Sequence, residues 1–411
     1  MRRTPLLTTF CALSAALIVG LTATLSGGSA SAAPTVAAKK LTVNKSYRMP
    51  STGSVKLVGH GFGHGHGMSQ YGAEGAAREG LSWKQILGFY YPGTSLSTAK
   101  GRISVLISAN TTRYTVVQAR SHLRVKRPST REAWTLPDRG ATKWRLAVSS
   151  KGESRVEYYR DKWRIWRTIP GTLEFHAGGA AIRLYVGNTS VRYRGTLRSA
   201  IPKPGTRERQ TVNLVDVNHY TQGVVAREMP ATWSPNAVRA QSVAARTYGV
   251  RQKATPLTRT YHICDTTACQ VYGGVEAEHS ASNAAVQATK SQVLTSGGKP
   301  AFTQFSSSSG GWTADSSKFS YLPAKQDPYD GWAGNPVHEW RLDLDVAKVE
   351  KAWPTIGNLE TIKIRDRDGN GEWGGRVNTL TMFGSQGSRT IYATEFRSKL
   401  GLRSTWFDFA S

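Results

Sequence analysis

Cysteine is scarce in this chain: there are three among 411 residues, and Cys11 lies in an apolar N-terminal run. The remaining pair, Cys264 and Cys269, is too small a set for a disulfide-built scaffold. Long apolar runs are also scarce, because none after about residue 25 reaches the length of a membrane span. The sequence has no G-x-S-x-G elbow and no phosphate-cradling P-loop. These absences exclude the serine hydrolases and nucleotide-binding proteins that depend on those loops.

The N-terminus has the pattern of a targeting segment. Arg2 and Arg3 precede an apolar run at about residues 6–25, and small residues then end at Ala30-Ser31-Ala32. This arrangement predicts a secretory signal peptide over residues 1–32. Cys11 lacks the small residues that precede a lipidated cysteine, so lipid anchoring is not expected. We therefore expect a secreted protein without a transmembrane anchor, either released outside the cell or held at the cell wall by charge.

Acidic side chains are few: 27 Asp and Glu oppose 54 Lys and Arg, which gives a formal net charge of +27. Much of the basic excess lies in residues 101–210. A positive charge of this size exceeds what solubility requires and indicates a polyanionic partner. Export removes nucleic acid from consideration, so anionic wall polymers are the expected partners.

The pattern of elements changes along the chain. Short runs rich in Val, Ile, Tyr and Trp predict strands at 103–108, 114–119, 123–127, 144–150, 155–160, 163–168, 182–187, 191–200 and 211–217, and again at 361–367, 376–384 and 390–396. Capping and periodicity predict helices at 82–90, from Ser234-Pro235 onward, at 280–290 and at 394–400. Seven glycines between Gly59 and Gly75 predict a tight loop. The expected fold class is α+β, with a basic β-rich lobe, a helix-containing lobe and a cleft between them.

Glu228 is the main candidate for a catalytic carboxylate. It ends an apolar, helix-like run and is followed by Met229 and Pro230. Burial at the end of such a segment disfavours the charged form and raises a carboxyl pKa, which suits a general acid for glycoside cleavage. The alternative is a Glu at a helix end exposed to water.

Two groups of residues could hold a metal. His60, His64 and His66 could bind zinc, but glycines flank each of them and leave little support for ring orientation. A loop lining a cleft is the preferred interpretation. His262, Cys264 and Cys269 would need a fourth ligand to hold zinc. A Cys264–Cys269 disulfide needs only the turn at residues 265–267 and is favoured in an oxidising compartment. We expect no metal and no cofactor, with zinc at this second group as the alternative.

Two further stretches imitate known motifs. Residues 366–372 resemble the start of a calcium loop, but Val377 stands where a bidentate Glu is required, so a polar turn is expected. The run Ser306–Ser309 has the composition of a linker. Apolar residues flank it on both sides, so we expect it to be folded, with hydroxyls available to a sugar.

Several separate segments resemble the SpoIID/LytB-domain family, whose members remodel bacterial peptidoglycan. The segments are GHGFGHGHGMSQYGA (59–73), VVAREMPATWSPNAVRAQSVAARTY (224–248), ICDTTACQVYGG (263–274), FTQFSSSSGGWTADS (302–316) and FRSKLGLRSTWF (396–407). The glycine motif usually follows the last of these, whereas here it comes first. The order resembles a circular permutation, which works if the two segments lie close in space.

The resemblance implies an activity and a site. Active members are lytic transglycosylases that cleave the MurNAc-GlcNAc bonds of peptide-stripped glycan strands, and the family's catalytic Glu falls on Glu228. A role in substrate binding is expected for Arg246, Gln241, Tyr248, Gln270, Tyr272, Ser306, Ser307, Ser308, Ser309, His64, His66, Ser69 and Gln70, with Trp312 and Trp233 as stacking candidates. The expected domains are a polar lead at 33–49, a Gly/His-rich segment at 50–97 that docks on the catalytic lobe, the basic β lobe at 98–195 and the catalytic domain at 196–411.

Two other activities stay open at this point. A lysozyme-like hydrolase would need a second carboxylate about 5–9.5 Å from Glu228, for which Asp265, Asp315 and Asp330 are possible suppliers. A non-catalytic wall-binding protein that enhances an amidase would not need Glu228 at all. Peptidoglycan glycan strands and a cell-wall amidase are the partners that these alternatives imply.

Overall fold

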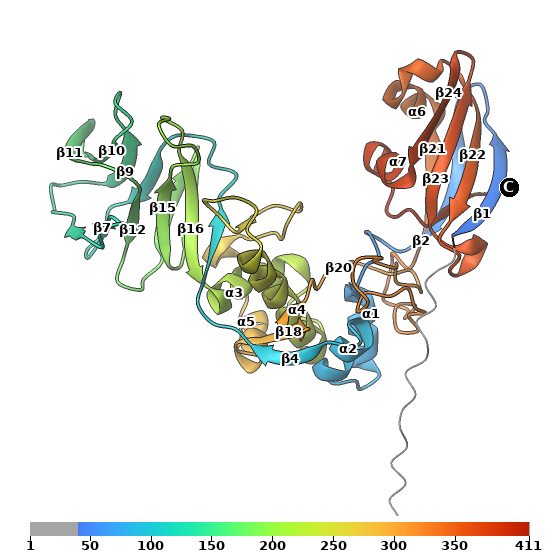
Figure 1. The fold of residues 1–411 in the computed structure, drawn as a ribbon, viewed down its shortest axis with the longest axis horizontal. Helices are drawn as coiled ribbons and strands as arrows, with labels where there is room; N and C mark the ends of the chain where they lie inside the picture. Colours follow the sequence, from blue (N-terminus) through green and yellow to red (C-terminus); the bar gives the residue numbers. More distant parts are fainter. Residues whose placement is uncertain (1–39, 411) are drawn as a thin grey trace, which may run out of the picture. The chain divides into compact units, whose positions relative to one another are not determined.

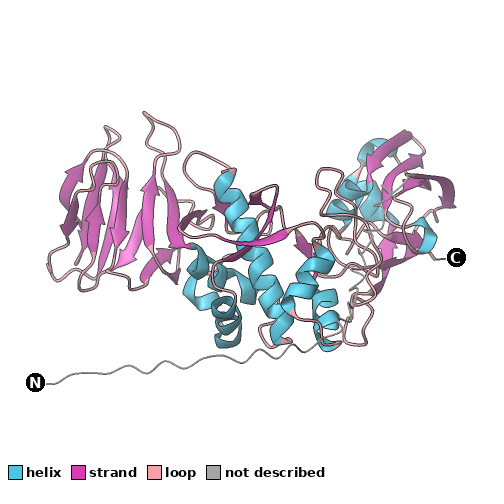
Figure 2. Ribbon diagram, turned by 60° about the horizontal axis from the view of Figure 1, so that its bottom comes forward, coloured by secondary structure: helices cyan, strands magenta, loops and turns pink. Residues whose placement is uncertain are grey.

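The computed structural model describes residues 40–410, so the expected signal peptide and residues 33–39 of the polar lead lie outside the described residues. A long run of strands, from β4 to β16 (residues 95–216), precedes helices α3 and α4 (residues 217–254), and further strands and helices follow in a sheet region of their own (Figures 1 and 2). This arrangement confirms the α+β class. Within residues 40–410, no helix is both long enough and apolar enough to cross a membrane.

A six-stranded antiparallel sheet forms much of the basic region. Its strand order is β11-β10-β9-β6-β13-β14. The strands are β6 (Thr115–Gln118), β9 (Lys143–Val148), β10 (Ser154–Tyr159), β11 (Trp163–Ile169), β13 (Ile182–Val186) and β14 (Thr189–Tyr193). Val117, Leu146, Val156 and Leu184 are fully buried along it. The alternation that predicted these strands thus separates a buried face from a basic one.

A seven-stranded sheet adjoins this region in sequence, with the order β17-β5-β16-β15-β12-β7-β8. Its strands are β5 (Arg102–Leu106), β7 (Arg124–Lys126), β8 (Ala133–Thr135), β12 (Leu173–His176), β15 (Thr196–Ala200), β16 (Gln210–Asp216) and β17 (Ile263–Cys264). The expected domain boundary between residues 195 and 196 falls inside this sheet, because β15 pairs with both β12 and β16. The expected strand at 191–200 is two strands divided at Gly195, where a Cβ would lie 2.2 Å from the Leu214 carbonyl oxygen.

Helices surround α4 (Pro235–Ala254). They are α1 (Gln70–Arg78), α2 (Trp83–Tyr90), α3 (Val217–Glu228), α5 (Ser280–Ala288) and the 3-10 turn η1 (Gly274–Ala277), next to a small sheet of β4 (Ser95–Thr98), β18 (Gln292–Ser296) and β19 (Lys299–Pro300). The helix expected at 82–90 is confirmed, with a capping box between Ser82 and Gln85. Ser234 precedes α4 as expected but makes no side-chain capping bond, and its hydroxyl and amide both donate to Glu74.

Helix α1 was not expected, because its glycines predicted a loop. The Ser69 hydroxyl caps the helix by accepting from the Gly72 amide. A Cβ at Gly72 would lie 2.1 Å from the Tyr90 hydroxyl, and one at Gly75 would lie 2.0 Å from the Tyr329 carbonyl oxygen. These glycines therefore permit close packing around a helix, a use of glycine that composition alone does not reveal.

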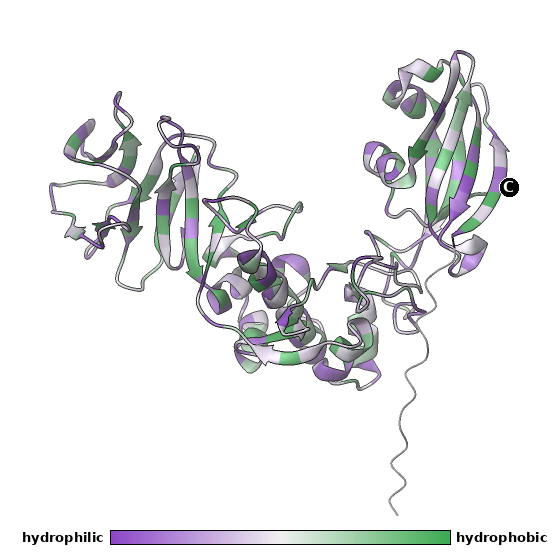
Figure 3. Ribbon diagram, viewed as in Figure 1, coloured by the Kyte–Doolittle hydropathy of each residue, from purple (hydrophilic) through white to green (hydrophobic). Residues whose placement is uncertain are grey.

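Residues 339–409 build a second hydrophobic cluster together with residues 41–60. Trp353, Phe396 and Phe407 lie in this cluster. One sheet has the order β1-β22-β23-β24 and another β21-β2-β25. The elements are β1 (Leu41–Arg48), β2 (Ser54–His60), β21 (Glu339–Asp345), α6 (Val346–Ala352), η2 (Pro354–Ile356), β22 (Leu359–Arg367), η3 (Glu372–Gly374), β23 (Val377–Gly384), β24 (Gly387–Tyr392), α7 (Ala393–Leu400) and β25 (Phe407–Phe409). Blue β1 and β2 accordingly lie among the red strands in Figure 1, and hydrophobic and hydrophilic residues alternate along these strands in Figure 3. The expected 196–411 domain thus includes a second hydrophobic cluster, and residues 41–60 complete that cluster.

The Gly/His segment is held by residues far away in sequence. Gly59 pairs with Phe407 between antiparallel β2 and β25. The His60 amide donates to the Trp406 carbonyl oxygen at 2.9 Å. The short parallel bridge of β3 (Met68–Ser69) with β20 (Phe305–Ser306) fixes the other end of the segment. The glycine motif and the 396–407 segment are therefore neighbours in space, which is the proximity that the permuted order of the two motifs requires.

Candidate functional site

A pocket of about 440 Å³ surrounds the carboxylate that ends α3. Its lining residues are Phe62, Gly63, His64, Glu228, Tyr248, Thr267, Ala268, Cys269, Gln270, Val271, Gln304, Phe305, Ser306 and Ser307. They come from the Gly/His segment, the ends of α3 and α4, the disulfide loop and β20. No residue of the expected β lobe at 98–195 is among these described lining residues, so the pocket is not a cleft between that lobe and the helices.

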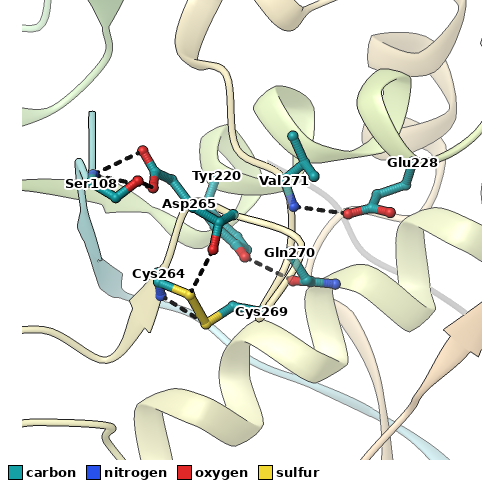
Figure 4. The surroundings of a disulfide bond; sticks show 9 residues. Ser108, Tyr220, Glu228, Cys264, Asp265, Cys269, Gln270 and Val271 are labelled. Atoms are coloured by element: carbon teal, nitrogen blue, oxygen red, sulfur yellow. Dashed lines mark hydrogen bonds between the residues drawn. A yellow bond between two sulfur atoms is a disulfide. The ribbon is translucent and has the colours of Figure 1, made fainter. Parts of the chain in front are cut away.

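Glu228 is half-buried in this pocket. The Val271 amide donates to Glu228 Oε1 at 2.9 Å (Figure 4). Burial raises the pKa of the Glu228 carboxyl, and the bond from Val271 offsets part of that rise. The negative end of the α3 dipole also disfavours a charged carboxylate at this position. The site is therefore built to keep Glu228 protonated to higher pH than an exposed Glu.

The disulfide loop presents the residue that holds Glu228. Cys264 and Cys269 are joined by a disulfide, with their Cα atoms 5.6 Å apart. The Asp265 carboxylate in the loop accepts from the Ser108 amide at 3.2 Å and turns away from Glu228 (Figure 4). The His262 Nδ1 accepts from the Ser104 amide. Within residues 40–410, no group of three or more His, Cys, Asp or Glu side chains is arranged to hold a metal ion.

Gln270 lines the pocket with an amide that is only partly hydrogen-bonded. The residue is 2% exposed. Its Oε1 accepts from the Tyr220 hydroxyl at 2.7 Å, while its Nε2 is buried and has no hydrogen-bond partner among the described residues. Tyr220 therefore fixes the amide orientation and leaves one donor of Gln270 unsatisfied.

The structure brings six of the expected site residues together: Glu228, Tyr248, Gln270, His64, Ser306 and Ser307 all line the pocket. Sequence reasoning missed Phe62, Thr267, Val271, Gln304 and Phe305. They lie within or beside the motifs at 59–73, 263–274 and 302–316, so position within a motif was the signal that could have identified them. Val271 acts through its backbone amide, which no side-chain pattern reveals.

Arg246 does not line the pocket, so the expectation that it contacts substrate is corrected. Its side chain is fully buried. The guanidinium donates to Asn218 Oδ1 at 3.1 Å and to the carbonyl oxygens of Gln292 and Val286 at 3.1 and 3.2 Å. Burial lowers its pKa to about 10. Arg246 therefore ties α4 to α3, α5 and β18.

Gln241 and Tyr272 are also interior residues. Gln241 is fully buried. The Tyr272 hydroxyl donates to Asn213 Oδ1 at 2.7 Å, and its ring packs against Tyr220. Neither is among the residues that line the Glu228 pocket. The stacking candidates Trp233 and Trp312 do not line it either, and Trp233 packs on Tyr71.

Four expected sugar contacts are buried away from the pocket, namely Ser308, Ser309, Ser69 and Gln70. Two aspartates hold the three serines in an interior network. Asp330 accepts from the hydroxyls of Ser69 and Ser308 at 2.5 and 2.7 Å. Asp327 accepts from the Ser309 hydroxyl at 2.8 Å. The second half of the serine run therefore anchors the loop, whereas Ser306 and Ser307 reach the pocket.

This network predicts a pH dependence of stability. Burial and the nearby Asp330 charge raise the pKa of Asp327 to about 7. The folded state then binds more protons than the unfolded state between about pH 4 and pH 7, so this contribution to stability is complete below that window and is lost as pH rises through 7. Asp327→Asn should remove the effect and raise Tm relative to wild type at pH 8 by about 3 °C more than at pH 5. Thermal melts across this range check it, and parallel curves for the two proteins would contradict it.

The loop carrying His64 and His66 depends on glycine. Gly63 and Gly67 have positive φ, and Cβ atoms there would lie 2.6 Å from Ser306 Cβ and 2.1 Å from the Gln304 carbonyl oxygen. The His64 Nδ1 accepts from the His66 amide at 3.0 Å. Desolvation, with help from His66 and Arg376, lowers the pKa of His64, which favours a neutral ring. His60 is separate, since its Nε2 bonds Glu372 at 2.8 Å.

The residues at 366–372 form the expected polar turn. Asp368 Oδ1 accepts from the backbone amides of Asn370 and Arg376 at 3.1 and 3.0 Å. The loop between β22 and β23 is thus closed by its own backbone.

Comparison with known proteins gives a family match in the middle of the chain. Residues 206–296 match the family described as "Stage II sporulation protein", SpoIID. This stretch contains Glu228, Tyr248 and Gln270. It does not contain His64, Ser306 or Ser307.

Curated relatives agree with this match. The chain is 38% identical over 154 residues to the amidase enhancer of Bacillus subtilis (strain 168), a match that covers 35% of this chain and 21% of that protein. It is 29% identical over 223 residues to stage II sporulation protein D of the same organism, covering 49% of this chain and 62% of that protein. A similar match, at 28% identity, links it to stage II sporulation protein D of Bacillus amyloliquefaciens. The chain therefore spans about a fifth of the first relative and less than two thirds of the other two.

Proposed function

Because this chain is related to the SpoIID/LytB family through a SpoIID domain at residues 206–296, we propose that it is a lytic transglycosylase of bacterial peptidoglycan. Its substrate is a glycan strand stripped of stem peptides, cleaved between MurNAc and GlcNAc. The observation that carries the proposal is Glu228: a half-buried carboxylate with a raised pKa in a pocket of about 440 Å³. Such a group is a suitable proton donor for a glycosidic oxygen.

One carboxylate is enough for this reaction. Protonated Glu228 gives its proton to the glycosidic oxygen as the C1–O bond breaks and positive charge develops at C1 of MurNAc. The resulting carboxylate takes the proton of the MurNAc 6-hydroxyl, whose oxygen then bonds C1 and closes the 1,6-anhydro ring. Glu228 ends protonated, and no water is consumed. Ser306 and Ser307, which line the pocket, supply hydroxyls for sugar oxygens.

The lining of the pocket favours this reaction over hydrolysis. Among the described residues that line it, Glu228 is the single carboxylate. Of the rival partners, Asp265 is engaged with Ser108 and Asp330 lies in the buried serine network. Asp315 lines a different recess. A water-activating or nucleophilic carboxylate, which a lysozyme-like hydrolase needs, is therefore not supplied by these residues.

Product analysis tests the proposal. Mass spectrometry of amidase-stripped glycan strands, digested with the protein, should find fragments that end in 1,6-anhydroMurNAc. Reducing-end fragments would mean hydrolysis. Intact strands that remain bound to the protein would contradict catalysis and favour a binding role.

The raised pKa of Glu228 predicts the pH profile. Because the acid must be protonated to act, activity should fall as pH rises through its pKa, and burial moves that fall above the range of an exposed Glu. The rate of fragment release measured from pH 4 to pH 8 checks this. A profile that already falls at the pKa of an exposed carboxyl would argue against a desolvated general acid.

The amidase-enhancer relative favours a second candidate function. A protein of that kind would bind peptidoglycan through the same pocket and present it to a cell-wall amidase.

Retention at the wall would come from the basic region under either candidate function. Arg167, for example, has no acidic partner within 4 Å among the described residues, and its guanidinium lies 5.0 Å from the centre of the Trp166 ring. We propose export and attachment to the wall for both candidate functions, and an amidase partner for the second.

A further inference from the structure

A second recess adjoins the Glu228 pocket and lies outside the SpoIID match. It has a volume of about 470 Å³. His64 lines both recesses, so they adjoin at this residue. Much of the second recess comes from β23 and its flanks, the start of α7 and the Gly/His segment. The docking of residues 54–69 against residues 339–409 therefore creates a cavity directly beside the proposed cleavage site.

The lining of this recess suits a sugar. Asn378, Thr379, Thr394 and Thr405 provide amide and hydroxyl groups. Tyr392, at the end of β24, is 71% exposed. A large exposed ring in the same recess as polar groups suits a carbohydrate, since the apolar face of a pyranose can cover the ring while its hydroxyls bond the polar groups.

The recess also has one cation available to a ligand. Arg397 on α7 is half-buried, and its Nε donates to the Arg403 carbonyl oxygen at 3.2 Å. It has no acidic partner within 4 Å among the described residues. The other two basic side chains differ from it: Lys40 pairs with Asp366 at 3.2 Å, and Arg376 is buried and donates to the Ser309 carbonyl oxygen, with its Nε and Nη1 also buried from a ligand.

Two carboxylates also line the recess. Asp368 is occupied by backbone amides, and Asp315 is exposed. Neither makes an ion pair with Arg397. Arg397 is therefore the half-buried cation of this recess that has no acidic partner among the described residues.

We propose that this recess is a second glycan subsite, in which Tyr392 stacks on a sugar ring and Arg397 pairs with a MurNAc lactyl carboxylate. The proposal rests on the proposed function, because a peptide-stripped strand is what carries free lactyl carboxylates. MurNAc supplies this carboxylate on every second sugar, whereas chitin oligosaccharides lack it. The subsite thus selects strands long enough to span both recesses and rich in free lactyl groups.

Binding in the Glu228→Gln background tests the subsite without cleavage. The probes are peptide-free GlcNAc-MurNAc oligosaccharides of two and six sugars, and a chitin hexasaccharide. Tyr392→Ala should weaken both hexasaccharides about fivefold or more. Arg397→Gln should weaken only the MurNAc-containing one by a similar factor, since it removes a charge-assisted hydrogen bond. The disaccharide, which the Glu228 pocket holds alone, should bind equally to all variants.

Matched variants separate the possible outcomes. Tyr392→Phe keeps the ring and should retain affinity, and Lys399→Gln removes a charge from the same helix outside the recess. Tyr392 is exposed, so its replacement should leave Tm unchanged and the measurement readable. Unchanged hexasaccharide affinity in both Tyr392→Ala and Arg397→Gln would overturn the subsite while the proposed function stands. If the parent protein bound none of the three probes, both proposals would fail together.

Discussion

Replacing Glu228 by Gln should reduce the release of 1,6-anhydro fragments by about two to four orders of magnitude or more. The amide has nearly the same shape, and its NH2 cannot transfer a proton to the glycosidic oxygen or recover one from the 6-hydroxyl. The carbonyl oxygen of Gln can still accept the hydrogen bond from the Val271 amide, so the pocket should keep its shape. Fragment yield from amidase-stripped strands, measured by mass spectrometry against wild type, gives the result.

Glu79→Gln is the matched control for that experiment. Glu79 follows α1, is exposed and does not line the Glu228 pocket. The same chemical change there should leave both Tm and fragment yield within error of wild type. If Glu228→Gln released anhydro fragments at the wild-type rate, the assignment of Glu228 as general acid would be wrong, whatever its position in the pocket.

Arg246→Ala should destabilise the fold by about 3–5 kcal/mol. The change removes three hydrogen bonds from a charged donor, leaves the buried carbonyl oxygens of Gln292 and Val286 without that partner, and opens a cavity beside α4. Arg246→Lys should also destabilise, because an ammonium group cannot reproduce the fork of the guanidinium. Chemical denaturation followed by circular dichroism measures the loss.

The exposed Lys253, in the last turn of the same helix, provides the comparison. Lys253→Ala removes a positive charge from α4 without touching the interior and should change stability by no more than about 0.5 kcal/mol. If Arg246→Ala unfolded at the wild-type denaturant concentration and yet lost glycan binding, Arg246 would be a ligand contact after all.

The contrast between Glu228 and Arg246 shows what the sequence could predict. The position of Glu228 at the end of a helix follows from the apolar run before it and from Pro230 after it, and the structure has this helix end. The sequence could not show that α5 and β18 cover Arg246, because that burial depends on tertiary contacts between segments far apart in the chain.

The serine run shows the same limit on a smaller scale. Ser306 to Ser309 are identical in sequence, yet two line the pocket and two are buried against aspartates about twenty residues later. Only the tertiary structure distinguishes them. Similarly, the glycines of residues 59–75 permitted either a loop or a tightly packed helix, and the structure contains both.

The pairing of β2 with β25 determines when the pocket can be completed. The Ser404 hydroxyl donates to the His60 carbonyl oxygen across 344 positions of sequence, and the Gly63 amide donates to the Arg403 carbonyl oxygen. During synthesis, residues 62–64 therefore lack these partners until residues 403 and 404 have been made. Contacts of such long range form slowly. The proposed cleavage activity should accordingly appear late in the maturation of each molecule, after β25 has been added to the sheet.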